Sequence, residues 1–313
     1  MSNPAPIEPH SSAVSSIVTG TRDVWLPFMC FVGPALFLLG GLLILPLLFS
    51  VGLSFYDTTI LSLIDGTDRF LGIENYAVLL QDEDFWSAVL RLLLFAGVTT
   101  GLELALALTV AFYLDQVWTP PKLLEALLLL PMLVIPVVSG LLFRYLFDPG
   151  EGLWGTLFER VGLEAPALLG HPILAFVVMV LQDVWRMWPF MFMIVYAGLK
   201  SLPREPMEAA RLDGCTNFQV FRFVLAPLLM PTVTVAVVLK LIESLRAFTE
   251  IYVMTGGGPG RSTELLSMYV VKVAFDYFQL GLGAAAGVLV FGFGMLIAGV
   301  LLTVQARRVR EVP

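Results

Sequence analysis

Long stretches without any charge restrict what this sequence can fold into. Residues 24–56 contain no charged side chain. A helix that crosses a bilayer needs about 20 apolar residues, so this stretch is long enough for one span. Of the 313 residues, 58% are hydrophobic and 14% are charged, whereas soluble domains are about 25% charged. We therefore predict an all-α integral membrane protein.

Six apolar segments separated by polar ones predict six transmembrane helices. The fifth begins near residue 223 and stays uncharged to residue 239. The other five predicted spans are residues 24–56, 92–114, 123–147, 172–199 and 277–306. We expect residues 24–306 to form one six-span domain, between a disordered tail at 1–23 and a basic tail at 307–313.

The positions of Lys and Arg predict the orientation, because cytoplasmic loops carry an excess of them. Six spans place both termini on one side of the membrane. If that side is the cytoplasm, nine basic residues of loops and tails lie inside: Arg22, Lys122, Lys200, Arg204, Arg211, Arg222, Arg307, Arg308 and Arg310. Four lie outside: Arg69, Arg160, Arg261 and Lys272. Both termini are therefore expected in the cytoplasm, with the acidic loops outside.

A polar segment at residues 200–222 separates the fourth and fifth spans, on the predicted cytoplasmic side. Pro203 and Pro206 favour a helix start, and Asp213 with Gly214 favours a turn. The segment therefore predicts two short helices with a break between them, which is more than a simple linker needs. The alternative is an amphipathic hairpin that only anchors the spans at the membrane surface.

Charged residues within membrane spans are costly and usually face protein or a water-filled path. Six are candidates for such deep positions: Glu103, Asp183, Arg186, Lys240, Glu243 and Arg246. One interpretation makes Glu103, Asp183, Arg186 and Glu243 a polar lining for a translocation path.

An alternative interpretation is that charges three residues apart on one helix neutralise each other. Asp183 and Arg186 are three residues apart and share a helix face, as do Glu243 and its neighbours Lys240 and Arg246. Near the outer interface, such pairs would only cancel each other's charge, and this reading is favoured for them. Glu103 has no partner in its own helix and is the better candidate for an interior polar position.

Several kinds of chemistry have no signature in this sequence. It contains no GxxxxGK[ST] motif, so it cannot hydrolyse ATP with a P-loop. It also lacks the Gly-x-Ser-x-Gly and HExxH signatures. Two cysteines and two histidines, without ligand spacing, predict neither a disulfide framework nor a metal site.

Residues 208–214 follow the pattern Glu-Ala-Ala-(x2)-Asp-Gly, with Phe221 and Pro227 downstream. This pattern resembles the EAA motif of bacterial ABC importer permeases. Three more stretches resemble the carbohydrate-uptake branch, of the maltose and glycerol-phosphate type: LGIENY at 71–76, AGLKSLP at 197–203 and TGGGPG at 255–260. The similarity runs from about residue 28 to 306. The sequence departs from the family pattern at Arg91-Leu92, Cys215 and Ala226, none of which removes a charge or turn of the motif.

The resemblance implies a role for the polar segment. In such importers it is the coupling helix, which sits in a groove on the ATPase subunit. Glu208 is then expected to pair with a basic residue of that subunit. Ala209 and Ala210 keep the helix slim, Asp213 belongs to the same motif, and Gly214 permits the turn.

The family also implies partners and a location. The partners are a second homologous permease, two ATP-binding-cassette ATPase subunits, an extracytoplasmic solute-binding protein and the lipid bilayer, with no nucleic acid. ATP and Mg²⁺ would be bound by the ATPase, so this chain needs no cofactor and is not an enzyme. The implied location is the bacterial cytoplasmic (inner) membrane, and the implied solute is a sugar, polyol or sugar phosphate.

Two other functions remain open from the sequence. One is an ion-coupled secondary carrier that works alone, although such carriers usually need a buried ionisable relay. The other is an ABC permease for a non-carbohydrate solute.

Overall fold

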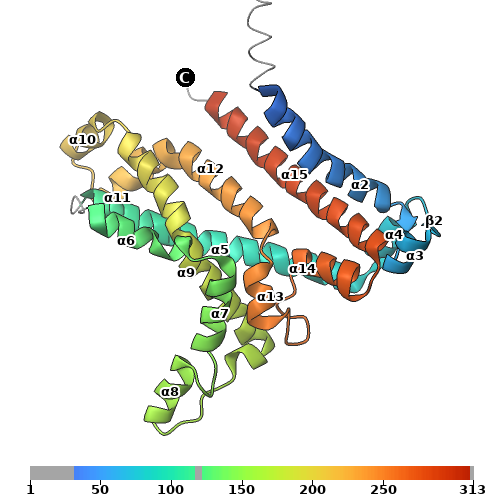
Figure 1. The fold of residues 1–313 in the computed structure, drawn as a ribbon. Helices are drawn as coiled ribbons and strands as arrows, with labels where there is room; N and C mark the ends of the chain where they lie inside the picture. Colours follow the sequence, from blue (N-terminus) through green and yellow to red (C-terminus); the bar gives the residue numbers. More distant parts are fainter. Residues whose placement is uncertain (1–31, 117–121, 311–313) are drawn as a thin grey trace, which may run out of the picture. The chain divides into compact units, whose positions relative to one another are not determined.

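The computed structural model describes residues 32–116 and 122–310, and it is almost entirely helical (Figure 1). The chain divides into two compact units, residues 1–52 and 53–313, which are described separately. The tail predicted at 1–23 lies outside the described residues, as do residues 311–313 of the predicted basic tail.

The described part of the first unit is a single helix. Val32–Leu53 is long and apolar enough to cross a membrane. Within it, the π-helical turn η1 (Gly40–Ile44) precedes α2 (Leu45–Leu53), and the Leu45 N–H bonds to the Gly40 carbonyl, five residues back. Pro46 has no N–H to bond to residue 42, so the regular α-helical ladder cannot continue through this point.

Four long helices of the second unit account for most of the remaining predicted spans. They are α5 (Glu83–Gln116), α9 (Pro172–Ser201), α12 (Ala226–Leu245) and α15 (Leu280–Arg310). α11 (Asn217–Gln219) and the π-helical η3 (Val220–Leu225) lead into α12. Among the described residues, five helices are long and apolar enough to span a membrane, or six with one bent pair. α15 continues to Arg310, so Arg307 and Arg308 extend the last helix.

The predicted third span is a bent pair of helices rather than one helix. α6 (Lys122–Leu133) and α7 (Pro136–Leu146) meet at an angle of 86°. Ile135 is extended, with φ −64° and ψ 146°, because the ring of Pro136 excludes the helical conformation from the residue before it. α7 then packs closely on α13 (Thr249–Thr255): a Cβ on Gly140 would lie 2.5 Å from the Glu250 carbonyl oxygen.

The predicted outer loops contain structure of their own. Residues 53–82 form a two-stranded antiparallel sheet, β1 (Tyr56–Asp57) and β2 (Arg69–Phe70), with α3 (Ile60–Asp65) between the strands and α4 (Glu74–Gln81) after them. The next loop holds α8 (Leu153–Arg160) and η2 (Leu168–Gly170). The last holds α14 (Leu266–Val271) and η4 (Lys272–Asp276). α10 (Glu205–Leu212) lies at the opposite end of this unit from α8 (Figure 1).

Two separate apolar clusters hold the second unit together, and α5 and α9 contribute to both. The first cluster includes Phe85 and Phe95 of α5 with Met179 of α9, packed against α13, α14 and α15. The second includes Ala107 of α5 and Val195 of α9, packed against α6 and the first half of α12. Charged residues of α5 and α9 near the junction of the two clusters are described next.

Candidate functional site

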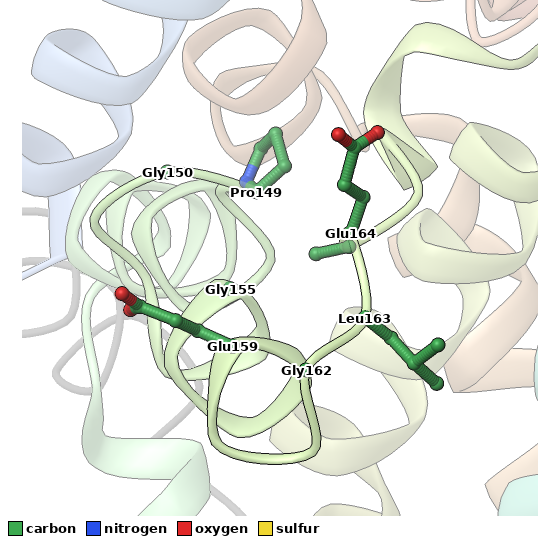
Figure 2. Close-up of a pocket in the computed structure, with 8 residues that line it drawn as sticks. Pro149, Gly150, Gly155, Glu159, Gly162, Leu163 and Glu164 are labelled. Carbon is green, nitrogen blue, oxygen red and sulfur yellow. The ribbon is translucent and has the colours of Figure 1, made fainter.

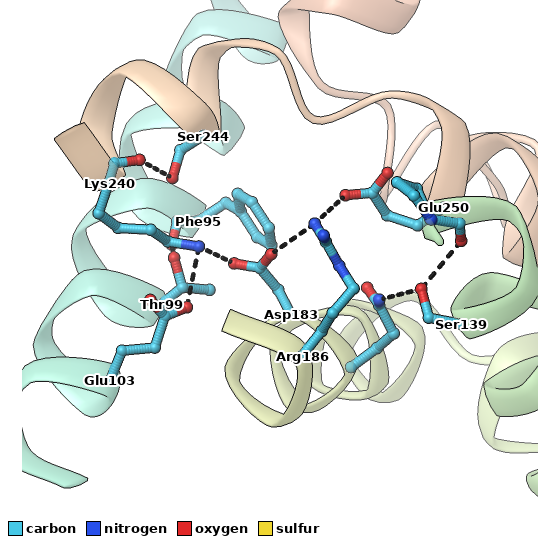
Figure 3. Close-up of polar contacts among 11 residues, drawn as sticks. Phe95, Thr99, Glu103, Ser139, Asp183, Arg186, Lys240, Ser244 and Glu250 are labelled. Atoms are coloured by element: carbon cyan, nitrogen blue, oxygen red, sulfur yellow. Dashed lines mark hydrogen bonds and ion pairs between the residues drawn. The ribbon is translucent and has the colours of Figure 1, made fainter. Parts of the chain in front are cut away.

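Five buried charged side chains form a continuous line across the second unit, here called the charge chain (Figure 3). Lys240 Nζ lies 2.9 Å from Glu103 Oε1 and 2.6 Å from Asp183 Oδ2. Arg186 Nη2 lies 3.9 Å from Asp183 Oδ1 and 3.2 Å from Glu250 Oε1. Acid and base therefore alternate from Glu103, through the two cations, to Glu250.

Four helices supply the charge chain, and all of its members are buried. Glu103 comes from α5, Asp183 and Arg186 from α9, Lys240 from α12 and Glu250 from α13. Lys240 and Glu103 have no exposed surface, and the other three are at most 6% exposed. Removing a charge from water costs several kcal/mol, so each of these groups depends on its neighbours for compensation.

Glu103 and Lys240 lie between the two apolar clusters, whereas Asp183 and Glu250 adjoin residues of the first cluster. On α5, Glu103 falls between Phe95 of the first cluster and Ala107 of the second. On α9, Asp183 and Arg186 fall near the middle of a 30-residue helix. A helix that spans a membrane has its middle deep in the bilayer, so this position does not suit an interfacial pair.

Neighbouring polar groups complete part of this layer. Gln182 Nε2 donates to Ser139 Oγ at 2.9 Å, which ties α9 to α7. Among the described side chains, both Glu103 oxygens, Gln182 Oε1 and Arg186 Nε are buried without a hydrogen-bond partner. Glu103 Oε1 is close enough to Lys240 Nζ for an ion pair, but the geometry is not that of a hydrogen bond. The layer formed by the charge chain with Gln182 and Ser139 thus contains, among the described side chains, hydrogen-bond acceptors and one donor that no partner uses.

The structure divides the predicted path residues into two groups. Glu103, Asp183 and Arg186 come together in the charge chain. Glu243 is only half-buried and, in the described part of the chain, has no ion pair; Lys240 pairs with Glu103 and Asp183 instead. The prediction that Glu103 occupies an interior position is confirmed, and its partner lies on a helix that local spacing could not identify.

Glu250 is the member of the charge chain that the sequence prediction missed. It sits near the start of the seven-residue helix α13, between the fifth apolar segment and the Gly-rich loop. It has no long apolar run around it, so it was not among the charges counted within spans. The sequence around Glu250 gives little indication of this role, because its partner Arg186 is distant in sequence and only the fold brings the two together.

An exposed elbow, residues 205–219, contains the predicted coupling residues. Asp213 caps the end of α10, and its N–H bonds to the Ala209 carbonyl at 3.0 Å. Gly214 follows with φ +84°, and the Cys215 N–H then bonds to the Ala210 carbonyl at 3.0 Å. This left-handed glycine closes the helix and redirects the chain, as the Asp-Gly pair predicts. Thr216 and Gln219 form a capping box that starts the second short helix.

The elbow and the turn that follows it expose polar side chains and three large apolar ones. Glu208 and Ala209 are exposed, and Ala210 is half-buried. Leu212 is 89% exposed, and Phe218 and Phe223, the latter just beyond the elbow, are each 70% exposed. On its other side, Met207 packs against the second apolar cluster. The elbow is therefore fastened to the helical bundle while its outer surface is free.

Replacing Gly214 with valine is expected to impair transport. A Cβ at this position meets no neighbour, so the whole effect comes from the backbone. A left-handed conformation costs an L-residue about 1–2 kcal/mol, and a β-branched side chain more. Solute uptake by the assembled transporter measures the effect, with Gly162→Val, also at positive φ but in the loop after α8, as the matched control. Equal uptake by both variants would argue against a special role for the elbow.

At the opposite end of the unit, ion pairs fasten the Gly-rich loop to the start of α5. Arg261 pairs with Asp84, and Lys272 Nζ lies 2.6 Å from Glu264 Oε2. Arg91, at one of the departures from the family pattern, donates from Nε to the Glu264 carbonyl at 2.8 Å. The Tyr269 hydroxyl donates a hydrogen bond to Asp82. Burial of the hydroxyl is the larger cause, and this hydrogen bond the next, that raises the pKa of Tyr269, so the hydroxyl keeps its proton and remains a donor.

An open pocket lies beside α8, between the turn at Pro149 and Gly150 and the segment at 162–165 (Figure 2). Two of the residues that line it, Glu159 and Glu164, are acidic. None of the predicted site residues lines this pocket. The pocket is far in sequence from both the charge chain and the elbow.

Relatives of known type resemble this chain over most of its length. It is 35% identical to the trehalose/maltose transport system permease protein MalF of Thermococcus litoralis, over 71% of this chain and 75% of that protein. It is 31% identical to the sulfoquinovosyl glycerol transport system permease protein SmoG of Agrobacterium fabrum, over 87% of this chain and 88% of that protein.

A solved structure with a similar fold is the bacterial alginate ABC transporter in complex with an alginate pentasaccharide-bound periplasmic protein. The match covers 93% of this chain and 96% of that one, with a TM-score of 0.76 and 19% identity, so it shows the fold. Residues 24–311 match the family described as the binding-protein-dependent transport system inner membrane component. The chain belongs to this family: it is a multi-pass inner-membrane permease subunit of an ABC importer, and the ATP that drives transport is hydrolysed by a partner ATPase.

Proposed function

We propose that this chain forms half of the translocation path for a sugar, a polyol or a similar hydroxyl-rich solute. Relatives with named solutes support the proposal, because they are permeases for trehalose, maltose and sulfoquinovosyl glycerol. The other half comes from a second, homologous permease, and an external solute-binding protein delivers the solute. Membership of a permease family sets aside the alternative of an ion-coupled carrier that works alone.

The observation that carries the coupling part of the proposal is the exposed elbow with Glu208 at its surface. A short helix closed by Gly214, and anchored by Met207 to the apolar cluster, can transmit force to the spans as a rigid body. Each of two ATPase subunits would receive one such elbow, one from each permease. Under this proposal the elbow and both termini face the cytoplasm, and the excess of Lys and Arg on that side supports this orientation.

Glu103, Asp183 and Arg186 are proposed to lie on the solute path, at the layer where the two apolar clusters meet. Buried charges in spans commonly mark such paths, and this layer retains unused donors and acceptors. Glu243, half-buried on α12 beside this layer, is kept as a fourth candidate. The layer is closed by its own ion pairs, so solute passage requires these pairs to separate.

Reconstitution of the full transporter tests the proposed function. We expect uptake into vesicles to require ATP, the ATPase and the solute-loaded binding protein together, with sugars and polyols as the first solute panel. Omission of any one component should reduce uptake to the background level. Uphill uptake by this chain alone, driven by an ion gradient, would contradict the proposal.

A further inference from the structure

One helix, α5, runs through the second unit without a break (Figure 1). It has 34 residues and no internal proline, so at about 1.5 Å per residue it is about 50 Å long. By contrast, α6 and α7 meet at 86°, and residues 246–248 separate α12 from α13. A displacement at one end of α5 is therefore passed to its other end by a continuous helix.

Contacts beside the Gly-rich loop hold α5 at the end opposite the elbow. Asp84, in the first turn of α5, pairs with Arg261, which directly follows this loop. Arg91, two turns further along α5, donates from Nε to the Glu264 carbonyl at 2.8 Å. These contacts join α5 to the predicted outer loops, on the side where the solute-binding protein of the proposed function delivers its solute.

At the elbow end, a pair of aromatic rings joins α5 to the segment that follows the elbow. The rings of Phe112, on α5, and Phe221, on η3, meet edge to face, with centroids 4.6 Å apart and an interplanar angle of 83°. Both rings are half-buried and pack against the second apolar cluster, as Met207 of the elbow does. Helix α10 of the elbow contacts η3, and the buried residues Val220 and Leu225 fix η3 in the bundle.

The chain itself connects the elbow to α9 before it and to η3 and α12 after it, whereas α5 is reached through side-chain contacts. An ion pair between Lys200 and Asp115 also joins the end of α9 to α5, but both side chains are more than a fifth exposed. Exposed pairs contribute little, whereas edge-to-face aromatic pairs add stabilisation beyond the area that they bury. The contact between Phe112 and Phe221 is therefore the stronger link between α5 and the elbow end of the unit.

We propose that Phe112 and Phe221 form a joint through which movement of the elbow reaches α5, and that α5 carries this movement to the predicted outer loops. The two phenylalanines are positioning residues, because they act on transport through α5 and touch neither ATP nor solute. This inference rests on the proposed function, since it requires the elbow to receive force from the ATPase. Loss of the joint should uncouple ATP hydrolysis from transport without releasing the ATPase.

The number of solute molecules taken up per ATP hydrolysed tests the inference. It is measured with the full transporter in vesicles, with the solute-loaded binding protein, for wild type and for Phe112→Leu, Phe221→Leu and the double variant. Leucine keeps the apolar surface and removes only the ring. A loss of general packing would lower the thermal unfolding midpoint but would not by itself change uptake per ATP.

We expect each single variant to lower uptake per ATP about two- to tenfold, the range that corresponds to the loss of one edge-to-face pair. The ATPase should still co-purify with the permease. The double variant should fall no further than the weaker single variant, because both changes remove the same contact. Phe112→Tyr keeps a ring at the joint and should retain most of the coupling.

Phe192→Leu is the matched control. Phe192 is a buried member of the same apolar cluster, and the rings described beside it, Trp188 and Tyr196, lie on its own helix, α9. The change therefore removes the same ring from the same cluster without separating two helices joined by an aromatic pair. It should lower the unfolding midpoint at least as much as Phe112→Leu and leave uptake per ATP unchanged.

The outcomes separate this inference from the proposed function. ATP-dependent uptake by the wild type, with unchanged uptake per ATP in Phe112→Leu and Phe221→Leu, overturns the joint and leaves the proposed function intact. An equal loss in Phe192→Leu, or additive losses in the double variant, also overturns it. If Phe221→Leu is not recovered in the membrane, Phe112→Leu decides the question, because Phe112 lies outside the elbow. Absence of ATP-dependent uptake by the wild type contradicts the proposed function instead.

Discussion

Replacing Glu208 with lysine is expected to abolish ATP-driven uptake while the chain still inserts into the membrane. Glu208 is exposed on α10, and its side chain makes no hydrogen bond or ion pair among the described residues, so reversing its charge should leave the permease folded. If it pairs with a basic residue of the ATPase, the variant places two like charges together at the interface. Such a juxtaposition costs several kcal/mol, which corresponds to a loss of more than a hundredfold in coupling.

Three measurements check this prediction: solute uptake, co-purification of the ATPase, and the amount of permease in the membrane fraction. Glu205→Lys is the matched control, because it makes the same charge change one turn earlier on the exposed surface of α10. It should retain most of the uptake. Wild-type uptake by the Glu208 variant would remove the main support for force transfer through the elbow.

Replacing Lys240 with methionine is expected to be the most destabilising single change in the charge chain. Lys240 is fully buried and balances both Glu103 and Asp183, so its loss leaves two carboxylates without their shared cation. Breaking a buried ion pair by removing one partner costs about 3–5 kcal/mol. The thermal unfolding midpoint of the purified transporter should fall by several degrees or more.

Lys200→Met provides the matched comparison, since it removes the same side chain from an exposed pair. Lys200 Nζ lies 2.7 Å from Asp115 Oδ1, but both side chains are more than a fifth exposed. Surface pairs contribute about 0–1 kcal/mol, so the midpoint should hardly change. Similar midpoints for the two variants would mean that Lys240 is not the centre of charge balance in this layer.

The sequence predicted the long helices well, because uncharged runs of more than 20 residues have few other ways to fold. It also located the elbow, since the turn after Asp213 needs a residue that tolerates a positive φ, and Gly214 supplies it. The break at Pro136 had a visible signal, but the 86° bend depends on how α7 packs against α13. The short strands at 56–57 and 69–70 are too brief to leave a pattern.

The charge chain was predicted only in part, for a physical reason. Spacing along one helix identifies pairs such as Asp183 and Arg186, and the structure makes that contact the longest of the four at 3.9 Å. The two shortest contacts join Lys240 to acids 57 and 137 residues earlier in the sequence (240 − 183 and 240 − 103). Such partners depend on tertiary packing, which a single sequence does not reveal.

The order of the charges along the chain has a consequence for how the protein is made. Glu103 and Asp183 are synthesised and inserted well before Lys240, and a charged residue at the centre of a span opposes insertion by about 2.5–3.5 kcal/mol. During translation, α5 and α9 must therefore wait in the bilayer, or beside the insertion machinery, until α12 arrives. A nascent chain cut short before residue 240 would carry Glu103 without its cation and Asp183 with only the longer contact to Arg186, and cellular quality control should recognise it as unfinished.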